Sequence, residues 1–196
     1  MKHIHVLLGK TLSGKSYIQD ELEKLYVTPI ITTTTRPARV NESNHINYHF
    51  VDKKTFENDQ KNHHAICIRE YKVTNKDTWS YYLNTKQLNT LSDQNSIILD
   101  YEGFKDLKDY IVYHKLDIKL HVWYLNINLK TRIDRHFKYR SSENETELLR
   151  RLYADELAFK HVLDDPDVKP IKSITDMITT IYYLALNNKK GKTKHE

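Results

Sequence analysis

Eight consecutive residues near the start of the chain have the types and spacing of a phosphate-binding loop. Residues 9–16 read Gly-Lys-Thr-Leu-Ser-Gly-Lys-Ser and match the Walker A pattern, G-x-x-x-x-G-K-[ST]. In such a loop backbone N–H groups point at phosphate oxygens, and the helix that follows adds its partial positive charge. We predict that Lys15 is catalytic, because it neutralises the outer phosphates, and that Ser16 is a ligand of Mg²⁺. The predicted ATP-binding residues are Gly9, Lys10, Thr11, Leu12, Ser13, Gly14, Lys15 and Ser16.

The carboxylate of Asp100 is a second candidate for the same chemistry. It follows the apolar run 97–99, which is typical of a buried strand. Folds with a phosphate-binding loop carry an acidic residue on a neighbouring strand, so we predict that Asp100 is the second ligand of Mg²⁺. Glu102, two residues further on, is predicted to face the same cleft.

Arginine is scarce in this chain and it is clustered. Seven of the eight arginines fall into two groups, which are Arg36 and Arg39, then Arg132, Arg135, Arg140, Arg150 and Arg151. A guanidinium group is a planar fork that binds phosphate oxygens, so the groups predict two separate anion-binding sites. Phosphoryl transfer brings two anionic groups together and needs cations on both. For Arg132 and Arg135 a salt-bridged, solvent-exposed helix face is an open alternative.

The hydrophobic pattern predicts the α/β elements that must position these residues. The phosphate-binding loop lies between an apolar run at 3–8 and a helical repeat at 17–26, as its motif requires. In the helical segment that begins at residue 129, Leu129, Ile133 and Phe137 form an apolar stripe. The other predicted elements are an extended segment at 30–35, a β-rich insert without a long helix at 36–84, strands at 96–100 and 119–127, and helices at 104–114, 129–161 and 175–186.

The composition is that of one soluble globular unit. Of the 196 residues 39% are hydrophobic and 29% are charged, and no apolar run approaches the roughly 20 residues that span a bilayer. We expect no membrane segment, and the single cysteine and the absence of a secretory signal pattern favour a cytoplasmic location. Packing explains the 14 tyrosines, and a solvated tail explains the lysine-rich end, better than a nucleic-acid partner does.

Two further segments complete a recognisable sequence. Residues 32–39 read Thr-Thr-Thr-Thr-Arg-Pro-Ala-Arg, and residues 46–51 read Ile-Asn-Tyr-His-Phe-Val. Together with the phosphate-binding loop and Asp100, in the same order and at similar spacings, they resemble guanylate kinase, whose acceptor region reads S-x-T-T-R-x-x-R followed by D-Y-x-F-V. The resemblance covers nearly the whole chain. It implies a nucleoside monophosphate kinase with ATP as the phosphoryl donor, Mg²⁺ as the cofactor and small-molecule nucleotides as partners.

The resemblance also implies roles for individual side chains. Arg140 and Arg151 correspond to the catalytic arginines of a lid, and Arg36 and Arg39 to a clamp on the acceptor's phosphate. The implied acceptor-binding residues are Thr32, Arg36, Arg39, Tyr48, Glu70, Tyr82, Asn84, Asp100 and Glu102.

Two departures from the family pattern bear on the choice of base. The closest alignment puts Cys67 where guanylate kinases carry a glutamate that binds the N1 and N2 donors of guanine. Asn84 stands where a base-facing hydroxyl is usual. A site built to hydrogen-bond a base can discriminate by roughly 10⁴ or more, so these changes predict a blurred or redirected base choice. The alternatives are a kinase for another nucleoside monophosphate or a sugar phosphate, and a catalytically inactive binding module.

The sequence thus predicts one guanylate kinase-like α/β domain, a parallel sheet flanked by helices with a small β-rich insert and a helical lid. The core spans 1–31, 85–128 and 156–186, the acceptor-binding insert 32–84, the lid 129–155 and a disordered tail 187–196. The predicted reaction is in-line transfer of the γ-phosphoryl group of ATP to GMP, dGMP or a related monophosphate. It needs no strong general base, because the acceptor oxygen is already anionic.

Overall fold

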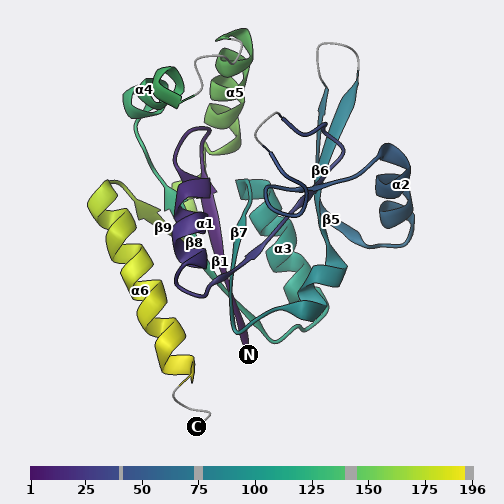
Figure 1. Cartoon of the computed structure of the whole chain (residues 1–196), viewed down its shortest axis with the longest axis horizontal. Coiled ribbons are helices and arrows are strands. Elements are labelled where there is room, and N and C mark those ends of the chain that lie inside the picture. Colours follow the sequence, from purple (N-terminus) through teal and green to yellow (C-terminus); the bar gives the residue numbers. More distant parts are fainter. Residues whose placement is uncertain (40–41, 73–76, 140–144, 193–196) are drawn as a thin grey trace.

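The protein is built on two sheets (Figure 1), and its computed structural model describes residues 1–39, 42–72, 77–139 and 145–192. The central sheet has five strands, and every neighbouring pair in it is parallel. Across the sheet these strands are β2 (Thr28–Ile30), β7 (Gln94–Ile98), β1 (Lys2–Gly9), β8 (Ile118–Leu125) and β9 (Val168–Ile171). The predicted parallel α/β sheet is therefore confirmed.

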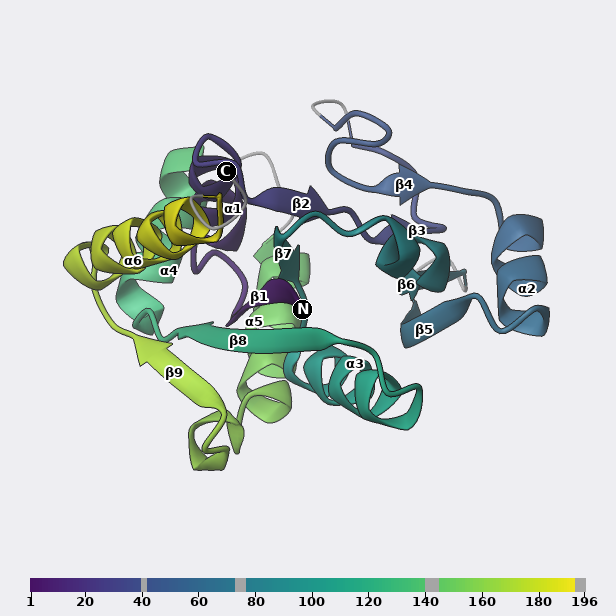
Figure 2. The ribbon, with the colours of Figure 1, turned by 90° about the horizontal axis from the view of Figure 1, so that it is seen from below.

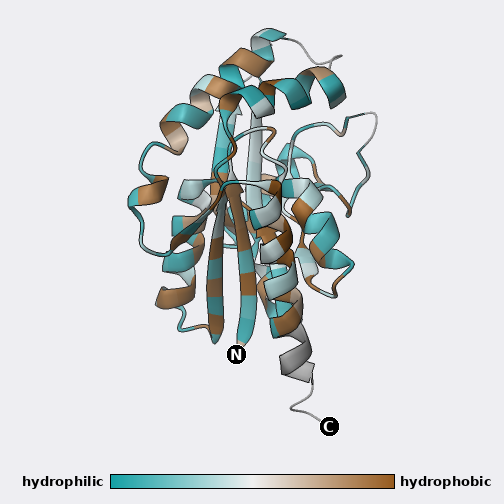
Figure 3. Cartoon of the chain, turned by 90° about the vertical axis from the view of Figure 1, so that its left-hand side faces the viewer, coloured by the Kyte–Doolittle hydropathy of each residue, from teal (hydrophilic) through white to brown (hydrophobic). Residues whose placement is uncertain are grey.

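Helices cover both faces of the central sheet, because successive residues of a strand point to opposite sides. Val6 of β1 packs in a cluster with α3 (Tyr101–Tyr113), whereas its neighbour Leu7 packs with α1 (Lys15–Glu23) and α6 (Ile174–Lys192). Figure 2 shows α1 and α6 on one side of the strands and α3 on the other. Bands of hydrophobic and hydrophilic residues alternate along the strands in Figure 3.

One face of the central sheet also buries histidine side chains. His5 of β1 is opposite His121 of β8, and their ring centroids are 4.8 Å apart. His5 is 1% exposed, and its Nε2–H donates to Oε1 of Gln94 at 2.8 Å. Burial lowers the pKa of His5 to about 4 and that of His121 to about 4, so both rings are neutral at pH 7.

A smaller, mixed sheet lies beside the central one and forms the insert. Its strands in order are β4 (His49–Phe50), β3 (Thr33–Thr34), β6 (Thr78–Asn84) and β5 (Ala65–Lys72). The sequence missed the helix in this region, α2 (Lys53–Lys61), which begins after Asp52 because that carboxylate accepts the N–H of Thr55. Its only buried residue, Phe56, packs on Tyr82 of β6, so its apolar signal is too weak to be read as a helix.

Two helices after β8 lie at the carboxyl ends of the central strands, α4 (Leu129–Tyr139) and α5 (Glu145–Ala158). The apolar stripe predicted for α4 is largely exposed, since Leu129 is 49% and Phe137 is 59% exposed. The buried residues of α4 are instead Arg132 and His136, each 1% exposed. This face is polar because it packs on the phosphate-binding loop rather than on the hydrophobic core.

Two short helices and the C-terminal helix complete the described chain. The 3₁₀ segments η1 (Thr85–Thr90) and η2 (Val162–Asp164) lead into β7 and toward β9. The helix α6 continues to Lys192, beyond residue 187 where the sequence predicts a disordered tail. None of the described helices is long and apolar enough to cross a membrane.

Candidate phosphoryl-transfer site

A cleft of about 350 Å³ lies between the phosphate-binding loop, the insert and α5. It opens at the carboxyl ends of the central strands, where parallel sheets usually bind ligands. Its walls include Lys15 of the loop, Arg36 and Arg39 of the insert, Asp100 after β7, and Arg151 of α5. The structure thus brings together five site residues that the sequence singled out from four separate segments.

The phosphate-binding loop has the backbone that its glycines allow. Gly14, directly before α1, has a φ of 101°, a left-handed conformation that favours glycine. A Cβ atom on Gly9 would lie 2.5 Å from Oγ of Ser13, so the tight turn excludes a side chain there. Nζ of Lys15 donates to the carbonyl oxygens of Gly9 at 2.6 Å and Lys10 at 3.2 Å. The ammonium group therefore folds back over the loop that it is predicted to serve.

Two arginines of α4 hold the loop by its carbonyl groups. Nη1 of Arg135 donates to the carbonyl oxygens of Leu12 at 3.0 Å and Ser13 at 2.7 Å. Nη1 of Arg132 lies 3.5 Å from the carbonyl oxygen of Thr11. The solvent-exposed alternative for these arginines is therefore wrong.

Two carboxylates of α5 contact the same loop from the cleft side. Oδ2 of Asp155 accepts the backbone N–H of Thr11 at 2.6 Å and lies 3.5 Å from Nη1 of Arg132. Glu156 bridges Nη2 of Arg132 and Nζ of Lys10. Asp155, which no sequence pattern marked, lines the cleft and occupies an amide of the phosphate-binding loop.

In the insert, Arg36 is fixed by its neighbours and almost fully buried. It is 4% exposed, and its Nη2 donates to both carboxylate oxygens of Glu42 at 2.9 and 2.8 Å. Its Nε donates to the hydroxyl of Tyr81 at 3.0 Å, and its guanidinium carbon lies 5.5 Å from the ring centroid of Tyr48. Although burial opposes it, hydrogen bonds from Arg39 N–H and Arg36 lower the pKa of Glu42, which keeps this carboxylate charged.

Arg39, Thr32 and Tyr48 also line the cleft. Arg39 is the more exposed member of the arginine pair, with 46% of its side chain exposed and Nη1 at 3.8 Å from Glu42. Burial raises the pKa of Tyr48, so its hydroxyl stays protonated and can donate. Tyr48 contacts Arg36, and Arg39 shares the carboxylate of Glu42 with it, an arrangement that suits the predicted phosphate clamp.

Four other predicted acceptor-binding residues have different partners. Tyr82 lines the cleft, but its hydroxyl donates to Asp59 of α2 at 2.7 Å, and Nδ2 of Asn84 donates to the same carboxylate at 2.9 Å. Glu70 is exposed and accepts from Oγ of Ser80. Glu102 is exposed and pairs with a lysine one turn along α3. Asn84, Glu70 and Glu102 do not line the cleft.

Asp100 also lines the cleft, and it contacts an arginine that no sequence pattern marked, Arg69. Nε of Arg69 donates to both oxygens of Asp100 at 3.2 Å, and its Nη1 donates to Asp106 at 2.9 Å. Asp100 also accepts the N–H of Gly103 at 2.6 Å and so caps α3. Arg69 was the one arginine outside the two sequence clusters, so only its position in the fold reveals it.

The lid arginines can be located in part. Arg150 and Arg151 of α5 both line the cleft, and Glu147 accepts two hydrogen bonds from Arg150 at 2.7 Å. Arg140 lies outside the described residues. The positive charges of α5 therefore face those of the insert across the cleft.

The residues predicted to hold Mg²⁺ suit that ion. Mg²⁺ keeps several waters and is usually bound by one or two protein oxygens together with substrate phosphates. Ser16, at the first turn of α1, and Asp100, at the cleft, supply a hydroxyl and a carboxylate of this kind. Within the described ranges no group of three or more His, Cys, Asp or Glu forms an all-protein metal site, which this mode of binding does not need.

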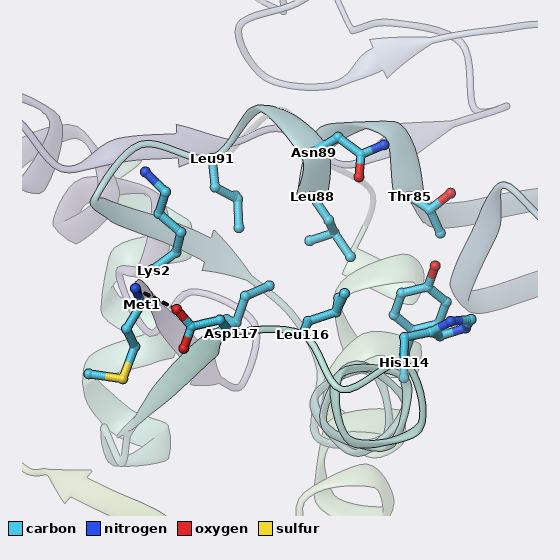
Figure 4. A pocket seen from close by; sticks show the side chains of 11 residues that line it. Met1, Lys2, Thr85, Leu88, Asn89, Leu91, His114, Leu116 and Asp117 are labelled. Atoms are coloured by element: carbon cyan, nitrogen blue, oxygen red, sulfur yellow. Dashed lines mark ion pairs between the residues drawn. The ribbon is translucent and has the colours of Figure 1, made fainter.

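A second cavity, of about 450 Å³, lies at the opposite end of the central sheet (Figure 4). Leu88, Leu91 and Leu116 contribute to its walls. Its charged groups are paired, since the amino group of Met1 lies 2.5 Å from Asp117. This cavity is remote from the phosphate-binding loop, so we assign the chemistry to the cleft.

The family model for guanylate kinase matches residues 1–177. Among solved structures, a guanylate kinase from Anaplasma phagocytophilum has a TM-score of 0.62 at 17% sequence identity, covering 100% of this chain and 87% of that one. A deoxyadenosine kinase from M. mycoides with bound dCTP has a TM-score of 0.42 at 19% identity, covering 94% of this chain and 99% of that one. No curated protein matches the chain.

Proposed function

Because the chain belongs to the guanylate kinase family and is a phosphotransferase, we propose that it transfers the γ-phosphoryl group of ATP to GMP, dGMP or a related nucleoside monophosphate. The proposal assigns Mg-ATP to the core, the acceptor to the insert at 32–84, and closure over both to the lid at 129–155.

One observation carries this proposal. Lys15 of the phosphate-binding loop, Arg36 and Arg39 of the insert, and Arg151 of α5 line a single cleft. A donor triphosphate and an acceptor monophosphate both need cations, and their reacting atoms must lie within about 3.5 Å of each other. A cleft with cations on opposite walls provides both conditions.

The chemistry asked of these side chains is positioning and neutralisation of charge. Arg36 is already held by Glu42 and Tyr81, so it can bind the acceptor's phosphate without losing side-chain freedom at that moment. Lys15 would move from the loop carbonyls to the outer phosphates of ATP. Arg151 would offset the negative charge that is shared between the two phosphates during transfer.

When bound, Mg²⁺ would neutralise the donor's phosphates, and Ser16 and Asp100 would hold it. Asp100 is already fixed in direction by the N–H of Gly103 and by Arg69. An oriented carboxylate of this kind is what an ion with strict octahedral geometry requires.

A coupled assay of ADP release tests the proposed reaction. Purified protein with Mg-ATP would be given GMP, dGMP, other nucleoside monophosphates and sugar phosphates in separate reactions. We expect ADP release that depends on a nucleoside monophosphate and on Mg²⁺. Activity only with sugar phosphates would reject the proposed acceptor class.

The inactive binding module remains the contrasting candidate, and calorimetry separates it from the kinase. Such a module has no need of a complete phosphate-binding loop, whereas this chain has Gly9, Gly14 and Lys15 in the geometry described. We expect Mg-ATP to bind, and Lys15→Ala to lower kcat by about 10²–10³. Failure of the wild-type protein to bind Mg-ATP would favour the module.

A further inference from the structure

The end of the cleft where Arg69 lies is shaped by an irregularity in β5. In the pairing of β5 with β6, Ile66 is opposite Leu83 and Arg69 is opposite Tyr81. An advance of three residues along β5 therefore matches an advance of two residues along β6. Within this bulge Cys67 has a φ of 53°. Because Leu83 and Tyr81 share a face, the bulge puts Ile66 and Arg69 on one face as well, where a regular strand would separate them.

The carboxylates near this end are already bound. Three acidic residues line the cleft in the described part of the chain, Asp100, Glu147 and Asp155. Asp100 accepts from Arg69, Glu147 from Arg150, and Asp155 from the loop N–H of Thr11. A base that presents N–H or NH₂ groups would therefore have to compete with donors that these carboxylates already bind, and for Asp100 and Glu147 those donors are charged.

The bulge itself adds a neutral thiol and a hydrogen-bond donor to the cleft. Cys67 is 6% exposed, and burial raises the pKa of its thiol, so it carries no charge that could accept strongly. Nη2 of Arg69 is shielded from solvent and has no hydrogen-bond partner among the described residues. A shielded donor without an acceptor is disfavoured, and an acceptor atom of a ligand would remove that penalty.

Aromatic rings make this end suitable for a flat ligand. Tyr71, Trp79 and Tyr81 line the cleft beside Arg69. The rings of Tyr71 and Tyr81 meet edge to face, with centroids 5.6 Å apart. A nucleobase could contact these rings with its face while its edge meets the guanidinium group.

We propose that Arg69 determines base specificity, by donating to a carbonyl oxygen of the acceptor base, and that no protein carboxylate reads a 2-amino group. The inference rests on the proposed function, since it concerns the acceptor of that reaction. The substrate class is 6-oxopurine monophosphates, with or without the 2-amino group. Guanidinium groups commonly pair with the O6 and N7 edge of such bases. A 6-amino group would instead place its own N–H donors against those of Arg69.

Matched nucleotides test this inference in the wild-type protein. IMP and GMP differ only in the 2-amino group, whereas IMP and AMP differ at the 6 position. Calorimetry in the presence of Mg-ADP would give the Kd of each one without requiring turnover. We expect IMP and GMP to bind within about threefold of each other, and AMP to bind about 100-fold more weakly. A preference for GMP over IMP above tenfold, equal binding of IMP and AMP, or no binding of any of them would overturn the inference.

Variants at position 69 separate base reading from a structural role. Arg69→Met removes the donor and should reduce the IMP-to-AMP affinity ratio to within about threefold of one. Arg69→Lys keeps a cation beside Asp100. The logarithm of its IMP-to-AMP affinity ratio should therefore be at least half of the wild-type value. A lower melting temperature with an unchanged ratio in Arg69→Met would assign Arg69 to stability alone. A wild-type protein that shows the expected ratios but releases no ADP would instead reject the proposed kinase reaction.

Discussion

The contact between Asp155 and the phosphate-binding loop leads to a prediction about ATP affinity. Oδ2 of Asp155 accepts the N–H of Thr11 at 2.6 Å, and the side chain is 16% exposed. This carboxylate occupies an amide of the loop that grips phosphate and faces the same cleft as Lys15. We expect a bound triphosphate to displace it, because two anions would otherwise share one ring of donors.

The expected effect of Asp155→Asn follows from the type of hydrogen bond that is lost. A hydrogen bond to a charged group contributes about 1.5–3 kcal/mol, and a neutral one about 1 kcal/mol. The substitution should therefore weaken the contact that competes with ATP by about 0.5–2 kcal/mol. Since 1.4 kcal/mol corresponds to a factor of ten, Mg-ATP should bind about 2- to 30-fold more tightly to the variant.

Asp155→Asn should change two measured quantities in opposite directions, the affinity for Mg-ATP and the stability without nucleotide. Isothermal calorimetry should show tighter Mg-ATP binding, while urea unfolding without nucleotide should show a less stable variant, because the contact between α5 and the loop is weakened. The neighbouring Glu156 provides a matched control, since it pairs with two side chains and is 56% exposed. Glu156→Gln should change Mg-ATP affinity by less than twofold. Unchanged or weaker Mg-ATP binding by Asp155→Asn would refute this account of the contact.

Further predictions concern catalysis, stability and pH. Lys15→Ala should lower kcat by about 10²–10³ while Mg-ATP binding measured by calorimetry is largely kept. Glu42→Ala leaves a buried arginine unpaired and should reduce the free energy of unfolding by about 3 kcal/mol in urea titrations, whereas Glu147→Ala, at a half-exposed pair, should cost less than about 1 kcal/mol. Because burial lowers the pKa of His5 and His121 from 6.5 to about 4, the unfolded chain takes up protons first. Stability should therefore fall as pH drops from 6.5 to 4, and less steeply in His5→Gln.

The phosphate-binding loop and the parallel sheet could be predicted because their signals are local. The loop motif requires a strand before it and a helix after it, and the structure has β1 ending at Gly9 and α1 beginning at Lys15. Asp100 was found for the same reason, since a buried strand that ends in a carboxylate is visible in a few residues.

The buried face of α4 could not be predicted, because its partner is far away in sequence. Hydrophobic periodicity assumes that a helix packs on an apolar core, and it selected Leu129 and Phe137. The helix packs instead on the polar backbone of the phosphate-binding loop, which Arg132 and Arg135 contact. Nothing within the helix itself distinguishes these two possibilities.

The cleft residue Arg69 was missed for a different reason. In a regular strand the alternation of side chains depends only on position, but the bulge at Cys67 shifts the register by one residue. Arg69 and Glu70 would lie on opposite faces of any strand, but the bulge exchanges the two, so that Arg69 is in the cleft and Glu70 is bonded to Ser80. Glu70 was predicted as an acceptor-binding residue, because a bulge has no sequence signature that would have pointed to Arg69.

The shared use of Asp100 has a thermodynamic consequence. The same carboxylate caps α3, pairs with Arg69 and is the predicted metal ligand. If a base draws Arg69 toward itself, the electrostatic environment felt by the cation changes too. The acceptor would then change the affinity for magnesium by some factor. Thermodynamic linkage requires magnesium to change the affinity for the acceptor by the same factor. The order in which the two ligands are added could not alter that factor.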